Sequence, residues 1–444
     1  MTTAYSDDFR TVAELGGPGW LAERRRAAAA SFTALGFPTR KNENWHYTSV
    51  APISDRTFRM VRTPGGDASS LDLTPYQFNS PEWPRLVFLN GHFVAEQSTP
   101  ADKLPEGVRV TTLGALLSEG ADASNGLSDL IEQHLGRVAD GEEHAFVALN
   151  TALATDGAVI VVGSEMVVDT PLHVVFVADG ASSGQAIQTR TLFVAGRHSK
   201  ATVIESFIGM GEADYFTNAV SEAVLDDGAT FTNIKVQRES QSAFHICTTS
   251  VHQARDSHYL HFSCALGAAL SRTNVYTILD GEGSGATLNG LYMLDGDQHC
   301  DHQTRIEHAK PNTFSRELYK GLLDGNSHGV FNGKVYVHPE AQKTDGKQEN
   351  NNILLSPTAH IDTKPELEIY ADDVRCTHGA TVGQLDDTAL FYMRSRGLSA
   401  AQARQLLTYA FAADVLETIE LEAVRDSLEE QTLERFTRHE VGTA

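Results

Sequence analysis

Short apolar runs with polar breaks dominate the middle of the chain. From Ala158 onward, runs such as AVIVV, LHVVFVA and TRTLFVA follow one another and are separated by Gly, Asp and Ser. Runs of this length, rich in β-branched residues and bounded by turn residues, predict strands. No long amphipathic pattern interrupts them until about residue 387. The central part of the chain is therefore predicted to consist of strands and turns.

A repeat runs through this region. Similar four-residue words (KATV, GATF, SHYL, GATL, NTFS and EAQK) begin at residues 200, 228, 257, 285, 312 and 340, in steps of 28, 29, 28, 27 and 28. Regular spacing in this range is typical of a solenoid, and it suits a coil of two or three short strands better than a four-stranded propeller blade. We expect a mainly β fold with a parallel β-helix, and a β-sandwich is the alternative. Asn350, Asn351 and Asn352 would suit a tight polar turn between coils.

The two ends of the chain differ from the middle. Residues 20–37 are alanine-rich and have the composition of a helix. Near the C-terminus, LDDTALFYMRSRG predicts a short helix that ends at Gly397, and Ser399 with Gln402 forms a capping box for a second helix. The expected organisation is a helical and mixed domain over 1–150, a β-helix core over 151–386 and a helical domain over 387–444.

Composition limits the partners and the compartment. The 444 residues carry a formal net charge of -23, with 35 Lys and Arg against 58 Asp and Glu. The electrostatic field of this negative charge repels phosphate backbones, so nucleic acid is not expected as a partner. No apolar run reaches the roughly 18 residues of a membrane helix, and the N-terminus lacks the apolar segment of a signal peptide. The four cysteines form no C-x-x-C pair, and a reduced, cytoplasmic location is expected.

Several segments hold residue types that could bind metals or transfer protons. One is QHCDHQTRIEH (298–308), which contains His299, Cys300, Asp301, His302 and His308. A metal site there needs ligands from a second strand, and the alternative is a polar outer face with Cys300 packed inward. A second histidine-rich run contains His252, His258 and His261, and it fits a solvated or stacked surface.

Two other patterns have weaker chemical interpretations. The glycine-rich stretch 280–290 lacks the G-x-x-x-x-G-K-[ST] pattern and fits a turn of a coil. A carbohydrate hydrolase needs two carboxyl groups that act as acid and base, and the candidate pairs are Glu366 with Glu368 and Asp372 with Asp373. However, Asp372 and Asp373 are neighbours and point to opposite faces of a strand. A glycosidase site is therefore not favoured.

The segment PELEIYADDVRCTHGAT places Cys376 two residues before His378. Its apolar positions change parity at Asp372–Asp373, which predicts a bend or a bulge there and directs Cys376 inward. His378 shares the face of Cys376 but lies at a rim, next to Gly379. Because this is the last strand region before the helices, we expect it to close the solenoid, and its unpaired edge must be capped or paired with another chain.

Residues 315–399, from SRELYKGLL to SRGLS, resemble the SufB/SufD family of iron–sulfur cluster assembly proteins. GFPTRKNENWHYTSV (36–50) and YADDVRCTHGATVGQLD are similar to the SufD branch of that family. SufB-like chains carry a cysteine, thought to hold the nascent cluster, near the strand that here reads QENNNILLS. The resemblance implies a β-helix with helical ends. It also implies a non-catalytic assembly subunit. Because this chain has asparagines where SufB-like chains carry that cysteine, an autonomous cluster scaffold is not expected.

The resemblance further implies partners and site residues. It implies a SufBCD-type complex with a SufB-like paralogue at the solenoid ends, and a SufC-like ABC-type ATPase docked near Phe391, Tyr392, Arg394 and Arg396. His378, with Cys376 beside it, is the candidate transient ligand for iron or an iron–sulfur cluster shared with the partner, and no tightly bound cofactor is expected. The exposed edge also allows a homodimer in isolation. The alternative is a purely architectural β-helix protein without direct metal contact.

Overall fold

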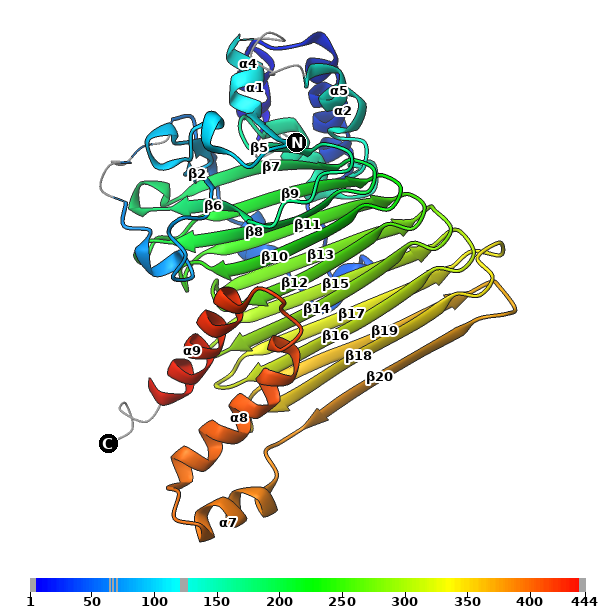
Figure 1. Cartoon of the computed structure of the whole chain (residues 1–444). Coiled ribbons are helices and arrows are strands. Elements are labelled where there is room, and N and C mark those ends of the chain that lie inside the picture. Colours follow the sequence, from blue (N-terminus) through cyan, green and yellow to red (C-terminus); the bar gives the residue numbers. More distant parts are fainter. Residues whose placement is uncertain (1–4, 64, 66–67, 69–70, 120–126, 439–444) are drawn as a thin grey trace.

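The centre of the molecule is a flattened parallel β-solenoid (Figure 1). The computed structural model describes residues 5–63, 65, 68, 71–119 and 127–438. Each coil contributes one strand to each of two facing sheets, so that each strand of a sheet pairs with the strand of the next coil. The predicted β-helix with helical ends is confirmed, and the β-sandwich alternative is wrong because neighbouring strands of the coils are parallel.

Sheet A has the strand order β19-β17-β15-β13-β11-β9-β7-β5-β4, and β1 pairs with β7. Its strands are β1 (Arg59–Met60), β4 (Val108–Thr112), β5 (Ala158–Val162), β7 (Gln185–Ala195), β9 (Phe216–Leu225), β11 (Phe244–Gln253), β13 (Leu270–Leu279), β15 (His299–His308), β17 (His328–Val337) and β19 (His360–Ile369).

Sheet B has the order β20-β18-β16-β14-β12-β10-β8-β6-β2-β3. Its strands are β2 (Arg85–Leu89), β3 (His92–Phe93), β6 (Leu172–Ala178), β8 (Lys200–Gly209), β10 (Thr230–Arg238), β12 (His258–Ala265), β14 (Gly285–Leu294), β16 (Phe314–Leu323), β18 (Asp345–Leu354) and β20 (Arg375–Gly383).

The register of sheet B explains the repeat. Thr230 pairs with His258 and His258 with Gly285, at spacings of 28 and 27 residues. Phe314 pairs with Asp345, a spacing of 31 residues, so the later coils are longer. The repeated words lie at the starts of sheet B strands or in the turns just before them. The 28-residue period in the sequence therefore marks the start of the sheet B strand in each coil.

Helices lie at both ends of the chain (Figure 1). They are α1 (Ser6–Ala13), α2 (Gly19–Leu35), α3 (Ala51–Ser54), α4 (Leu113–Glu119), α5 (Ser128–His134), α6 (Ala145–Leu153), α7 (Asp387–Ser395), α8 (Ala400–Leu416) and α9 (Glu422–Arg438). The predicted capping box at Ser399 and Gln402 is present, and Gly397 follows α7 with a φ of 98°. Across the described ranges, no helix is long and apolar enough to cross a membrane.

Apolar packing attaches the helices to the outer faces of sheets A and B. Phe32 of α2 and Leu149 of α6 pack with Phe216 and Phe244 on the outer face of sheet A. The C-terminal helices α8 and α9 cover the outer face of sheet B, where Val415 and Leu428 join the cluster of its apolar residues. Burial of this apolar area stabilises both attachments.

The end of the solenoid nearest the N-terminus is closed. There β4 runs antiparallel to β5, and β3 runs antiparallel to β2, so both sheets end in short turned-back strands. Phe93 of β3 packs on the interior ring of Phe88, at 5.6 Å between ring centroids. Residues within 1–150 thus complete both sheets. The proposed division into three domains stays a prediction.

A buried ion pair stabilises this closed end. Arg190 Nη2 lies 2.7 Å from Glu222 Oε2, and both side chains are almost fully buried. The Glu222 carboxylate also accepts hydrogen bonds from the backbone N–H groups of residues 136–139, at 2.8–3.1 Å. A buried carboxylate needs such partners because the charge has lost its water. Glu222 therefore holds the N-terminal segment against sheet A.

The structure corrects one local prediction and refines another. Asn350, Asn351 and Asn352 do not form a turn, because they lie within β18. Asp372 and Asp373 form the predicted bend and not a bulge within one strand. They lie at the corner where the chain leaves β19 of sheet A and enters β20 of sheet B. The change of parity arises because the chain changes sheets.

Candidate functional site

The solenoid is open at the end nearest the C-terminus. Strands β19 and β20 are the outermost strands of sheets A and B, and within the described residues no strand pairs with their outer edges. The positions of β20 are nearly all exposed. Ile369, Tyr370 and Val382 are large apolar residues exposed in this last coil. The predicted closing coil with an unpaired edge is therefore confirmed.

Cys376 and His378 both lie on β20 but have different surroundings. Cys376 is half-buried and packs with Val335, Val337 and Ala371 in a small apolar cluster. Burial raises the pKa of the Cys376 thiol, so the neutral form, which is a poor metal ligand, is favoured. His378 is exposed. The predicted inward direction of Cys376 fits this placement.

His378 stands at the end of a column of polar side chains. Glu317 of β16 is in register with Gln348 of β18, and Gln348 is in register with His378 of β20. Gln348 Nε2 donates a hydrogen bond to Glu317 Oε2 at 2.6 Å, and both side chains are buried. Burial raises the pKa of Glu317 to about 7. Glu317 and Gln348 were not predicted from the sequence, because 31 and 30 residues separate successive members of this column and only the strand register brings them together.

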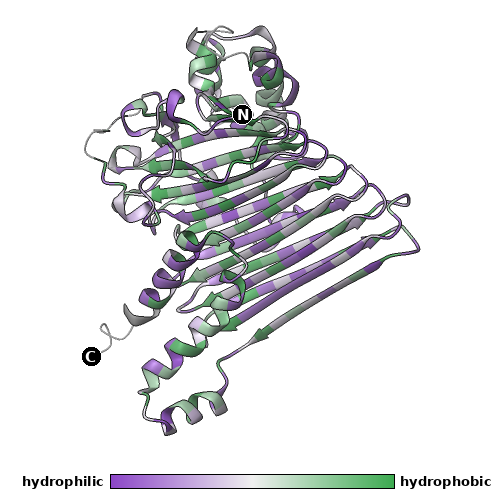
Figure 2. Ribbon diagram, in the orientation of Figure 1, coloured by the Kyte–Doolittle hydropathy of each residue, from purple (hydrophilic) through white to green (hydrophobic). Residues whose placement is uncertain are grey.

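The interior near the open end contains hydrogen-bonded polar side chains. Near the closed end the interior holds stacked rings, with Phe176 and Phe207 centroids 4.9 Å apart. Near the open end, Asn350 Nδ2 donates to the Tyr292 hydroxyl at 3.1 Å and Asn352 Nδ2 donates to Asn350 Oδ1 at 2.7 Å. In Figure 2, which colours the residues of both faces, β6 is mainly hydrophobic and β18 is largely hydrophilic. The interior next to His378 therefore contains polar side chains that are hydrogen-bonded to one another.

The residues expected to dock a partner lie on and just after α7. No residue of α7 is buried. Phe391 is 73% exposed and Tyr392 is 58% exposed. The Arg396 guanidinium donates to the Tyr392 hydroxyl at 3.0 Å and lies 5.1 Å from the centre of that ring. Arg394 is also exposed. The aromatic and basic side chains thus form one exposed surface, which we call the α7 surface.

The cluster at 298–308 is divided between two faces. Cys300 is buried in the interior, as expected, and its sulfur lies 3.6 Å from Nδ1 of His302. Asp301 points outward, where Arg272 Nη1 contacts its carboxylate at 2.7 Å and Thr48 donates to it at 2.6 Å. This carboxylate already has a cationic partner. The contacts therefore favour a structural role for Asp301.

The remaining candidates do not converge either. His261 is buried beside Asn233, His252 pairs with Asp280 at the surface and His258 packs on Phe314. Lys334 contacts both Glu366 and Glu368, at 3.3 and 2.8 Å, so that acidic pair has a cationic partner. The glycine-rich stretch 280–290 forms a turn and the start of β14, as expected.

The fold and the open end together define a class of protein, a two-sheet β-solenoid with one closed end and one end left unpaired. Comparison with known proteins identifies the family. The description "SUF system FeS cluster assembly, SufBD core domain" matches residues 176–411, and "SufBD protein N-terminal region" matches residues 4–174. The chain therefore belongs to the SufBD family of iron–sulfur cluster assembly proteins.

Similar proteins cover nearly the whole chain. An iron–sulfur cluster assembly SufBD family protein of Synechocystis is 34% identical over 418 residues, which is 92% of this chain and 89% of that protein. The iron–sulfur cluster assembly protein SufD of Escherichia coli is 34% identical over 415 residues, 92% of this chain and 90% of that protein. SufD of Bacillus subtilis is 28% identical and covers 93% of each chain. The resemblance to the SufD branch is confirmed.

Proposed function

We propose that this chain is a SufD-like, non-catalytic subunit of a cytoplasmic SufBCD-type complex. Its open end pairs with a SufB-like paralogue, and iron or a nascent iron–sulfur cluster is bound transiently at the junction. The observation that carries this proposal is the position of His378. It is exposed on β20, whose outer edge has no partner strand among the described residues, and it follows the buried pair of Gln348 and Glu317 in register. A partner strand added to this edge would bring its own side chains next to His378.

His378 is the better of the two candidate ligands. A neutral imidazole binds divalent iron without first losing a proton, whereas a thiol binds as the thiolate. Cys376 is half-buried and its pKa is raised, so it is the secondary candidate. One histidine from this chain is too few ligands for a stable site, and the partner must supply the others. A single histidine ligand from this chain suits iron or a cluster that is bound transiently and then released.

The test of the junction is His378→Ala in the reconstituted complex with its SufB-like and SufC-like partners. We expect the complex to assemble but to accumulate much less iron and sulfide, measured by chemical analysis and visible absorbance. Thr377→Ala, the exposed neighbour whose side chain points to the opposite face of β20, is the matched control and should form clusters normally. Normal cluster formation by His378→Ala would favour the alternative of a purely architectural protein.

The α7 surface is the proposed docking site of the ATPase. Exposed aromatic and arginine side chains are enriched at protein–protein interfaces. Deleting residues 387–444 is a poor test, because α8 and α9 cover apolar residues of sheet B that would then be exposed. Phe391→Ala with Tyr392→Ala removes the surface alone and should weaken ATPase binding at least about tenfold, the equivalent of 1.4 kcal/mol.

Leu35→Ala is the control for the α7 variant, since Leu35 is also a large exposed apolar residue but lies on α2. It should leave ATPase binding unchanged. Binding is measured by titration of the purified full-length chain with the ATPase. Unchanged affinity in the α7 variant would refute the docking assignment and leave the junction proposal standing.

A further inference from the structure

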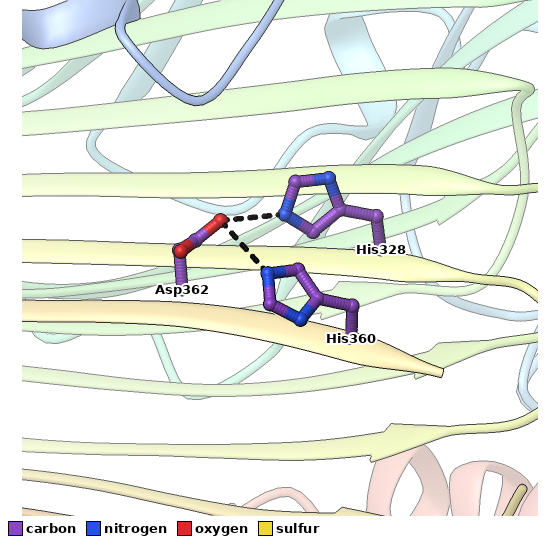
Figure 3. Close-up of side chains that lie close together, drawn as sticks. All are labelled: His328, His360 and Asp362. Carbon is purple, nitrogen blue, oxygen red and sulfur yellow. Dashed lines mark hydrogen bonds and ion pairs between the residues drawn. The ribbon is translucent and has the colours of Figure 1, made fainter. Parts of the chain in front are cut away.

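A second group of candidate ligands lies on the outer face of sheet A. His328 opens β17 and His360 opens β19, and the two residues are in register across these strands. Asp362 follows two residues after His360 and therefore points to the same face. Figure 3 shows both imidazole rings turned toward the Asp362 carboxylate. These residues were not predicted from the sequence, because 32 positions separate the two histidines and only the strand register aligns them.

The geometry of the three side chains is convergent. His328 Nε2 lies 2.8 Å and His360 Nε2 lies 3.4 Å from the same oxygen, Asp362 Oδ2. All three ligand atoms lie within 4.8 Å of one another. Neighbouring ligand atoms around a metal with bonds of about 2.1 Å are separated by about 3.0–3.4 Å. Small rotations of these side chains would therefore place all three atoms in one coordination shell.

The surroundings leave the carboxylate available. Within the described part of the chain, the ion pairs of Asp362 are those with the two histidines, and no lysine or arginine neutralises it. Asp301 on the same face differs, since Arg272 contacts it at 2.7 Å. The His360 side chain is 65% exposed, which gives a cation access from solvent.

Neighbouring residues fix the orientation of one ligand. The ring of His299, one strand further along sheet A, packs edge-on against His328 with 4.7 Å between centroids. His299 Nε2 is itself hydrogen-bonded to the Thr48 hydroxyl at 2.9 Å, so His299 positions His328 and is not counted as a ligand. Packing of this kind holds a ligand in its binding orientation.

We propose that His328, His360 and Asp362 form a binding site for a divalent first-row transition metal. Two imidazoles and one carboxylate favour ions such as Fe²⁺, Co²⁺, Ni²⁺ or Zn²⁺ over Mg²⁺ and Ca²⁺, which prefer oxygen ligands. Three ligands leave coordination positions open to water or to a group of another chain. The site lies on β17 and β19 of sheet A, whereas His378 lies on β20 of sheet B, and the site does not depend on the proposed function.

The test is a titration of the untagged, full-length chain with Co²⁺, followed by its visible spectrum, and competition with Zn²⁺. We expect one high-affinity ion per chain, and an at least tenfold weaker dissociation constant in Asp362→Asn and in His360→Ala. His252→Ala is the matched control, because His252 and Asp280 form a surface pair with a single histidine on the same sheet. This variant should bind Co²⁺ like the wild type.

The alternative role of the cluster is a hydrogen-bonded contact between β17 and β19 without a metal. Under that alternative, the wild type and both site variants bind Co²⁺ equally or not at all, and this result would overturn the proposal. Circular dichroism of each variant checks that the fold is retained. His360 is mostly exposed, so His360→Ala leaves no buried cavity and remains informative. Cluster formation by the reconstituted complex tests the junction separately.

Discussion

The two ends of the solenoid differ in how their last strands are covered. At the closed end, antiparallel β3 and β4 complete the sheets, and the buried Glu222 carboxylate has an arginine and a row of backbone N–H groups as partners. At the open end, no strand among the described residues pairs with the outer edges of β19 and β20, and apolar side chains are exposed there. A terminal coil that faces water needs a cap. The chain therefore supplies its own cap at one end, and under the proposed function a partner chain caps the other.

The largest effect is expected at the closed end. Glu222→Gln removes the charge that pairs with buried Arg190 and turns an amide N–H group toward backbone donors. Breaking one partner of a buried ion pair costs about 3–5 kcal/mol. We expect that loss in the free energy of unfolding, measured with urea. Glu165→Gln, in the exposed pair with Arg197, is the control and should cost less than about 1 kcal/mol. A loss of that small size in Glu222→Gln would show that the N-terminal segment is held elsewhere.

A smaller, pH-dependent effect is expected in the interior beneath His378. The pKa of Glu317 is raised from 4.5 to about 7 by burial, so the folded chain prefers the protonated acid. As pH rises from about 5 to 8, the unfolded chain loses this proton first, and wild-type stability should fall by up to about 3 kcal/mol. Glu317→Gln cannot ionise there. The variant should therefore match the wild type at pH 5 and exceed its thermal midpoint at pH 8.5.

The control for this experiment is Glu340→Gln, an exposed glutamate in the turn before β18. Its thermal midpoint should follow the wild type at both pH values. Parallel curves for wild type and Glu317→Gln would mean that water reaches this part of the interior. Water would then enter the solenoid from the open end as far as β16, two strands inward from β20 in sheet B.

The smallest effect on stability is expected at the free edge. Val382 lies on β20 and is 49% exposed, so Val382→Lys should change the thermal midpoint of the isolated chain little, by the equivalent of about 0.5 kcal/mol or less. A lysine on an edge strand opposes strand addition, and association with the SufB-like partner should weaken. Sedimentation of the mixed chains measures this. Val167→Lys, at an exposed valine before β6, should associate normally; equal association of both variants would place the interface away from β20.

The sequence predicted the coils and the inward side of Cys376 because both depend on local alternation and regular spacing. It did not predict the polar interior, because asparagines taken alone favour turns. Their actual partners, such as the Tyr292 hydroxyl for Asn350, lie two coils away. The site at His328, His360 and Asp362 was missed for a related reason. The coil between the two histidines is longer than the 28-residue period, so their alignment follows only from the strand register.

The C-terminal helices have one further consequence for the ends. Lys320 of β16 reaches α8, where its ammonium donates to the Phe411 carbonyl at 3.0 Å and pairs with Asp414. The helices thus hold the middle strands of sheet B and reach the end of β18, where Ile353 packs against them and Arg404 donates to the Leu355 carbonyl at 3.1 Å, while β20 lies beyond this attachment. Local unfolding starts where contacts are fewest. The last coil is therefore expected to fray first and exchange its amide hydrogens fastest, and binding of a second chain would slow that exchange without any change in the middle of the molecule.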